Sequence, residues 1–173
     1  MDTIALDSLL GDGSDRQFWL KPVGPPKDHP DWDAPEDRTW SQSQVEIHFS
    51  RSPARVAVGA IIIAYRVRYQ KLIYVAQRLP VAEWGPSEVR SEYSRRRWPH
   101  LIKVRNLTPQ YGAVWNQYSL RPFELAREYN EHSLDQPARL GSILRGNDKT
   151  AIPRPYAECL IRCIREIPQG LTV

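Results

Sequence analysis

Two nearly continuous apolar runs, rich in β-branched residues, constrain the fold of this chain most strongly. The first covers residues 56–65 and the second residues 72–76, with a short basic stretch between them. Runs of this kind are typical of strands buried on both faces. We therefore expect a β-hairpin here. Its turn type stays open, because residues 66–71 contain no Asn-Gly pair.

Further strands and helices are expected around this hairpin. Residues 17–23, 45–49 and 101–107 have strand-like patterns, and residues 45–49 alternate apolar with polar side chains. A helix is expected over 119–132, and a clearer one begins at Pro155, where apolar residues recur every three or four positions. This order predicts an α+β fold, a mostly antiparallel β-barrel covered by helices.

The length and the amino-terminal segment indicate the domain organisation. A chain of 173 residues suits one domain, which we place at residues 16–173 after a flexible acidic leader at residues 1–15. The proline-rich residues 24–37 are expected to form an irregular loop, with Trp32 pinned onto the domain. No apolar run approaches ~20 residues and the leader is acidic, so we expect a cytoplasmic protein without membrane contact.

The distribution of charge favours a polyanionic partner. Residues 1–37 hold nine acidic and three basic residues, a balance of −6, so the remainder carries +10 of the stated net +4. Nineteen of the 24 basic residues are arginine, which pairs phosphate oxygens bidentately and stacks on bases. A GC-rich genome could also explain the arginine excess, but it does not explain the clustering.

Sequence motifs for catalysis and metal binding are missing. The chain has no Gly-rich phosphate loop, no Gly-x-Ser-x-Gly elbow and no His-Glu-x-x-His helix. Cys159 and Cys163 are expected to be small buried side chains on a helix, since the four histidines are too scattered to complete a zinc site. We expect no cofactor. Asp148 and Lys149 look like a turn before a helix, and this turn is retained as a candidate site.

Aromatic side chains interleaved with arginine are the positive signal. Trp40 follows Arg38, and Trp98 follows three consecutive arginines. Recognition of unpaired bases uses this mixture, because an aromatic face stacks on a base while arginines hold the phosphates.

The order of short motifs resembles the EVE and YTH families of the PUA-like superfamily. The resemblance spans about residues 17–168 and rests on five segments. These are Phe18-Trp19-Leu20-Lys21-Pro22, Arg38-Thr39-Trp40-Ser41, Val58-Gly59-Ala60-Ile61-Ile62-Ile63-Ala64-Tyr65 with the following Leu72-Ile73-Tyr74-Val75-Ala76, Arg97-Trp98-Pro99-His100-Leu101-Ile102-Lys103-Val104, and Leu144 to Pro153. Ala60 departs from the family pattern, which has Asp there.

The resemblance implies a PUA-like barrel that holds a flipped, modified base in an aromatic cage. Trp40 and Trp84 would be the cage walls, and Asn147 or Asp148 would read the polar edge of the base. The full set of base-binding candidates is Trp40, Ser41, Trp84, Trp98, Asn147 and Asp148. The phosphate-binding candidates are Arg66, Arg68, Arg95, Arg96, Arg97, Lys103, Arg105 and Arg145.

Three functions remain open from the sequence. The first is a non-catalytic reader of modified DNA or RNA, which could work with a separately encoded nuclease or other effector. The second is a PUA-like hydrolase or nuclease acting on nucleic acid. The third is a protein-interaction domain whose basic face binds an acidic partner.

Overall fold

The computed structural model describes residues 15–24, 26–30, 42–66, 71–108 and 148–165, together with Ser8. Their elements, in chain order, are β1 (Phe18–Val23), β2 (Gln44–Phe49), β3 (Ile61–Arg66), β4 (Lys71–Arg78), the 3-10 helix η1 (Val81–Glu83), α3 (Glu92–Arg97), β5 (His100–Asn106), β6 (Thr150–Ile152) and α7 (Arg154–Arg165).

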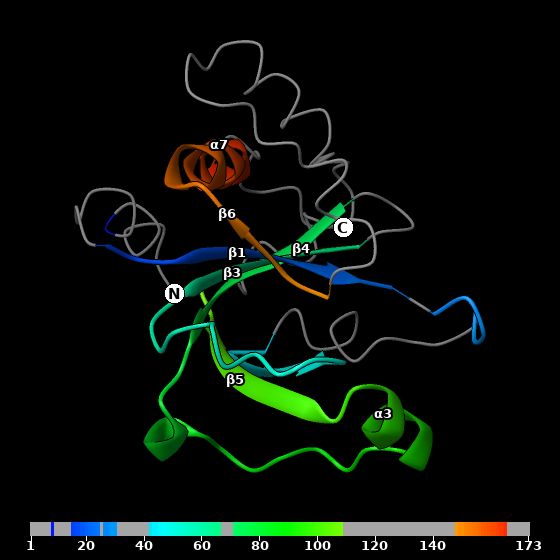
Figure 1. The fold of residues 1–173 in the computed structure, drawn as a ribbon. Coiled ribbons are helices and arrows are strands. Elements are labelled where there is room, and N and C mark those ends of the chain that lie inside the picture. Colours follow the sequence, from blue (N-terminus) through cyan, green and yellow to red (C-terminus); the bar gives the residue numbers. More distant parts are fainter. Residues whose placement is uncertain are drawn as a thin grey trace, which may run out of the picture.

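The described strands form one mixed sheet with the order β2-β5-β4-β3-β1-β6. Only β1 and β3 run parallel; the other neighbouring strands are antiparallel. The expected hairpin is confirmed as β3 and β4. The sheet curls into a half-barrel, with α7 on one side and α3 on the other (Figure 1). The expected mostly antiparallel, barrel-like sheet with flanking helices is thus confirmed as a curled half-barrel.

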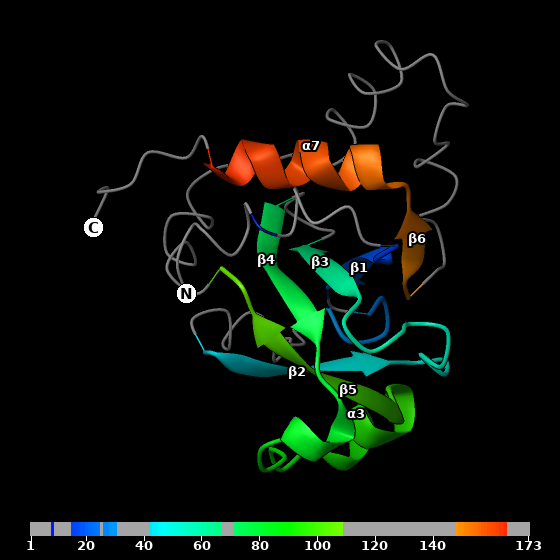
Figure 2. The ribbon, with the colours of Figure 1, turned by 90° about the vertical axis from the view of Figure 1, so that its left-hand side faces the viewer.

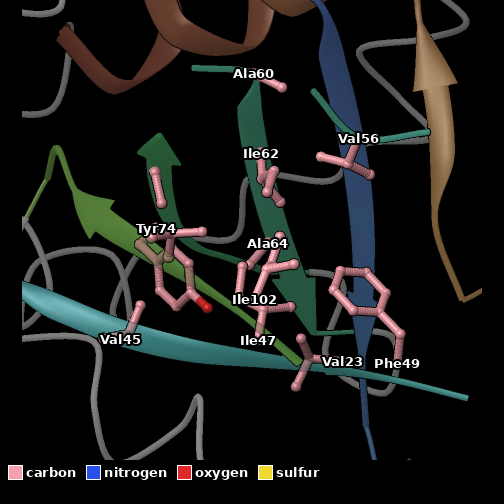
Figure 3. Packing of buried hydrophobic residues seen from close by; sticks show 12 residues of the cluster. Val23, Val45, Ile47, Phe49, Val56, Ala60, Ile62, Ala64, Tyr74 and Ile102 are labelled. Carbon is pink, nitrogen blue, oxygen red and sulfur yellow. The ribbon is translucent and has the colours of Figure 1, made fainter. Parts of the chain in front are cut away.

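The hydrophobic core fills the inside of this curl. Alternation along each strand points one set of side chains inward, where the two arms of the sheet face each other (Figure 3). Ile62 and Ala64 of β3 meet Ile47 of β2 and Ile102 of β5 there, and each of these residues is buried. Trp19 packs against the same cluster while partly exposed.

The opposite face of β1, β3 and β4 is covered by α7, which lies across these strands (Figure 2). Phe18 and Leu20 of β1 belong to this face, and both are buried. The apolar stripe of the helix is also buried, and its members are Tyr156, Ala157, Leu160 and Ile161. The helix expected from Pro155 is confirmed, and it begins one residue earlier.

Two segments differ from the sequence expectation. Residues 56–60 form a turn and not strand, since Gly59 adopts a φ of 84°, which glycine tolerates and an extended strand does not use. Residues 92–97, for which no helix was expected, form α3. Ser91 caps this helix by accepting a hydrogen bond from the Ser94 amide.

The expected helix at residues 119–132 and Trp32 lie outside the described residues. None of the helices in the described ranges is long and apolar enough to cross a membrane.

Candidate nucleic-acid interface

Residues 81–98, here called the strap, run over the outer face of β2 and β5. The strap is attached at the start of β2 by the Gln44 side chain, which donates to the Glu83 carbonyl at 3.2 Å and accepts from the Gly85 amide at 2.7 Å. These bonds flank Trp84. The Trp84 indole donates to the Leu79 carbonyl at 3.2 Å, and the ring stays partly exposed.

The other end of the strap is α3, which lies below the end of β2 (Figure 2). Arg95, Arg96 and Arg97 are exposed there. Arg96 lies 3.9 Å from Glu92, and Arg97 lies 3.2 Å from Asp28. Exposed pairs of this kind contribute about 0–1 kcal/mol, so a phosphate can compete for these guanidinium groups.

The helix is fixed in place by a side chain that the sequence analysis did not select. Arg90 donates to the carbonyls of Ser94 and Trp98 at the carboxyl end of α3, and the Ser94 carbonyl also accepts from the Trp98 amide. Trp98 also packs edge-on against Tyr93, with ring centroids 6.2 Å apart. Trp98 is therefore part of the framework that holds α3.

A hollow of about 540 Å³ lies on α3 and is lined by Glu92, Tyr93, Arg96 and Arg97. Two arginines and one aromatic ring give it the chemistry to accept a phosphate and its attached sugar.

Asp148 joins the two edge strands of the open sheet. Its carboxylate accepts from the Ser50 hydroxyl at 2.9 Å and from the Arg51 amide at 2.8 Å, both just after β2. Asp148 itself lies two residues before β6, and Lys149 is 3.3 Å from its other oxygen. Burial alone would raise the pKa of this carboxyl, but the hydrogen bonds from Arg51 and Ser50 and the charge of Lys149 hold the pKa below its ordinary value.

Two ammonium groups face one aromatic ring beside this junction. Lys21 Nζ lies 5.2 Å and Lys149 Nζ lies 5.3 Å from the centroid of Phe49. Both distances fall within the ~6 Å range of cation–π attraction. The ring and the carboxylate of Asp148 together stabilise positive charge in this partly buried place.

Trp84 and Asp148 lie at opposite ends of β2. The residues on both sides of Trp84 bond to Gln44 at the start of β2, and Asp148 bonds to Ser50 just past its end. Six strand residues at about 3.3 Å each separate these positions by about 20 Å. One base cannot contact both side chains, so the structure does not bring together the expected wall and edge reader.

Lys103 does not offer its ammonium to a phosphate, contrary to expectation. It is 1% exposed and lies 3.3 Å from Glu46 Oε1, directly across the β2–β5 pair. The Glu46 carboxylate also contacts His48 Nε2 at 3.3 Å. Lys103 and Arg105 lie on the same outer face of β5, as strand alternation requires. Of the two, only Arg105 is exposed, and it forms an ion pair with Glu83 at 3.3 Å.

Burial and hydrogen bonding together set the protonation states of His48 and Glu46. Burial is the main cause that lowers the pKa of His48 to about 4, with the nearby charge of Arg90 acting in the same direction. At neutral pH the ring is therefore neutral, and its N–H donates to Glu46. Burial would raise the pKa of Glu46, but hydrogen bonds from Ser87 and Lys103 outweigh it and lower the pKa.

The remaining candidates are only partly placed. Arg66 ends β3, and its side chain is not among those described. Trp40, Ser41, Arg68, Arg145 and Asn147 lie outside the described residues. Cys159 is a free thiol on α7 and is partly rather than fully buried. Within the described ranges, no three His, Cys, Asp or Glu side chains cluster as metal ligands would.

The sequence matches no protein-family profile and no curated protein sequence. Among solved structures, the chain is similar to the YTH domain of the Zygosaccharomyces rouxii MRB1 protein, which was solved in complex with N6-methyladenosine RNA. The TM-score is 0.45 and the sequence identity 11%, over 92% of this chain and 93% of that chain.

Proposed function

We propose that this protein is a non-catalytic nucleic-acid-binding module of the PUA-like class that binds single-stranded nucleic acid along the strap. The observation that carries the proposal is the pair of surfaces at its two ends. Exposed arginines of α3 stand at one end, and the partly exposed Trp84 stands at the other. This combination supplies phosphate contacts and a stacking face to the same ligand.

The base would be held at the Trp84 end. Trp40 precedes Gln44 by four residues, and Gln44 bonds the backbone on both sides of Trp84. Four residues reach at most about 14 Å, so the chain length is compatible with a Trp40 ring close to Trp84. We propose these two rings as the walls of a cage for a modified base, with Ser41 beside them. Asp148 is left out of this cage because of its distance.

A catalytic role is less well supported than a binding role. The densest group of titratable side chains in the described part of the chain is Glu46, His48 and Lys103. Each is at most 9% exposed, and strap backbone lies over them. A substrate could not reach these groups without displacement of the strap.

Fluorescence anisotropy with labelled oligonucleotides tests the proposal. RNA and single-stranded DNA of one sequence would be compared with and without N6-methyladenine, 5-methylcytosine or 5-hydroxymethylcytosine. We expect binding that weakens with salt and is tightest for one modified base. No binding to any oligonucleotide would refute the proposal. Cleavage of the labelled oligonucleotide in the presence of Mg²⁺ or Mn²⁺ would establish a nuclease instead.

Substitution of Trp84 locates the base. Trp84→Ala removes the stacking face, whereas Trp84→Phe keeps an aromatic ring and loses only the indole N–H bond to Leu79. Affinity should fall for the alanine variant and largely recover for the phenylalanine variant. Val58→Ala is the matched control, since Val58 is an exposed apolar residue (59%) outside the strap.

A further inference from the structure

The outer face of β2 and β5 carries a buried ion pair directly under the strap. Glu46 and Lys103 are register partners, with side chains 8% and 2% exposed and charged atoms 3.3 Å apart. An ion pair out of water keeps its charged state only when its remaining hydrogen-bonding groups are also satisfied. Here the strap satisfies them.

The hydrogen bonds from this pair go to strap backbone. Lys103 Nζ donates to the Gly85 carbonyl, and Glu46 Oε1 accepts from the Glu88 amide at 3.3 Å. Gln44, next but one to Glu46 on the same strand, holds Glu83 and Gly85 as described above. Polar side chains of two strands thus fix the backbone between residues 83 and 88.

Hydrophobic burial in the strap is limited to the partly buried rings of Trp84, Tyr93 and Trp98. Val81 and Val89, its two valines, are 70% and 102% exposed, and η1 has no buried residue. Within α3 only Ser94 is buried. Because apolar burial is the usual means of fixing a segment to a sheet, a segment with so little of it relies on its polar anchors as well.

We propose that Glu46 and Lys103 are positioning residues for the nucleic-acid surface, which they create by locking the strap in one conformation. This inference rests on the proposed function. The lock keeps Trp84 and the arginines of α3 at a fixed separation of about 20 Å, the length of β2. At about 3.4 Å per stacked nucleotide, this separation matches about six nucleotides. A ligand that touches both ends then meets a preorganised surface and loses less entropy on binding.

The test compares the wild-type chain with the double variant Glu46→Gln/Lys103→Met. The double variant removes both charges with little change in volume, and so leaves no single buried charge behind. Hydrogen exchange is measured at Gly85 and Glu88, whose amides the anchors hold, and at residues 61–66 of β3 as an internal control. Affinity is measured for an octanucleotide and for a dinucleotide of the same composition.

We expect exchange at Gly85 and Glu88 to rise at least tenfold while exchange in β3 is unchanged. Octanucleotide affinity should fall at least tenfold, and dinucleotide affinity, which needs only one end of the strap, should stay within twofold. A merely structural role would change β3 exchange and both affinities together. Unchanged strap exchange, or a mobile strap with unchanged octanucleotide affinity, would overturn the inference.

Gln44→Ala is the variant to measure if the double variant does not fold. It removes two anchors from a partly exposed side chain, and the same pattern of exchange and affinity is expected in weaker form. If the wild-type chain binds neither oligonucleotide, the proposed function fails, and the exchange measurements alone then decide whether the strap is locked by these residues.

Discussion

Asp148 accepts a 2.9 Å hydrogen bond from the hydroxyl of Ser50. This contact connects β6 with β2, the strands at the two ends of the sheet order. β2 and β6 are the two edges of the curled sheet, so the bond closes one end of the half-barrel. A carboxylate that the sequence suggested as a base reader is thus a structural link between residues 98 positions apart.

Removal of this link should destabilise the fold more than it weakens binding. Asp148→Ala leaves the Ser50 hydroxyl and the Arg51 amide without their acceptor, a loss of about 1–3 kcal/mol in the free energy of unfolding. Urea denaturation measures it. Asp28→Ala is the matched control, because Asp28 forms an exposed ion pair with Arg97 and should cost less than about 1 kcal/mol. Equal losses in the two variants would contradict the structural role of Asp148.

The arginines of α3 should contribute to affinity without base preference. Arg95→Ala/Arg96→Ala should weaken binding to every oligonucleotide alike. It should also make the slope of log K against log salt shallower by about 1.4, because each phosphate of a single strand that the protein neutralises adds about 0.7 to the slope. Arg55→Ala/Arg162→Ala removes the same charge from exposed positions outside the strap and should leave the slope unchanged. Equal slopes in the two double variants would exclude α3 from the interface.

Tryptophan substitutions should separate binding from stability. Trp40→Ala and Trp84→Ala should each cost about 1–3 kcal/mol of affinity for the preferred modified oligonucleotide, with modest loss of stability. Trp19→Ala should leave the intrinsic affinity intact and lower the free energy of unfolding by about 3 kcal/mol, since its ring packs against the inner core. If Trp40→Ala unfolds the protein, Trp40 is a core residue and the cage lies elsewhere.

His48 should make stability depend on pH in a mildly acidic window. Its pKa is about 4 in the folded protein against an ordinary 6.5, so the unfolded chain binds the proton more readily. The stabilisation is complete above pH 6.5 and is lost as the pH falls toward 4, by an amount on the order of 3 kcal/mol. Urea denaturation across this range in wild type and His48→Gln measures it, and the variant should show a smaller loss. Glu46 and Asp148, with lowered pKa values, titrate mainly below this window.

Much of the sheet follows from sequence patterns. Alternation in residues 45–49 predicted β2 closely, the strand-like pattern of residues 101–107 predicted β5, and the apolar runs predicted β3 and β4. The six-residue α3 was missed because it has no apolar stripe, and its helix signals are a Ser cap and good helix formers that also occur in loops. β6 has three residues, too few for any period to be visible.

The candidate site was predictable in kind but not in arrangement. The run Arg95 to Arg97 is exposed as expected, whereas Lys103 is buried. Alternation assigns Lys103 to the outer face of β5, but it cannot tell a face open to water from one covered by another segment of the chain. Likewise, the spacing of Trp84 and Asp148 along the sequence carries no information about which end of β2 each one reaches.

The parallel pairing of β1 has a consequence for how the chain folds. Phe18 pairs with Ile61 on one side and with Ile152 on the other, so both neighbours of β1 come from distant parts of the chain. Such contacts form slowly, because the long stretch of chain between the two strands must first close into a loop. During synthesis the hairpin of β3 and β4 can assemble first. β1 can pair with β6 and pack against α7 only after these last elements have been made. We therefore expect a late folding step that depends on the last strand and helix, and aggregation of nascent chains that stop before residue 150.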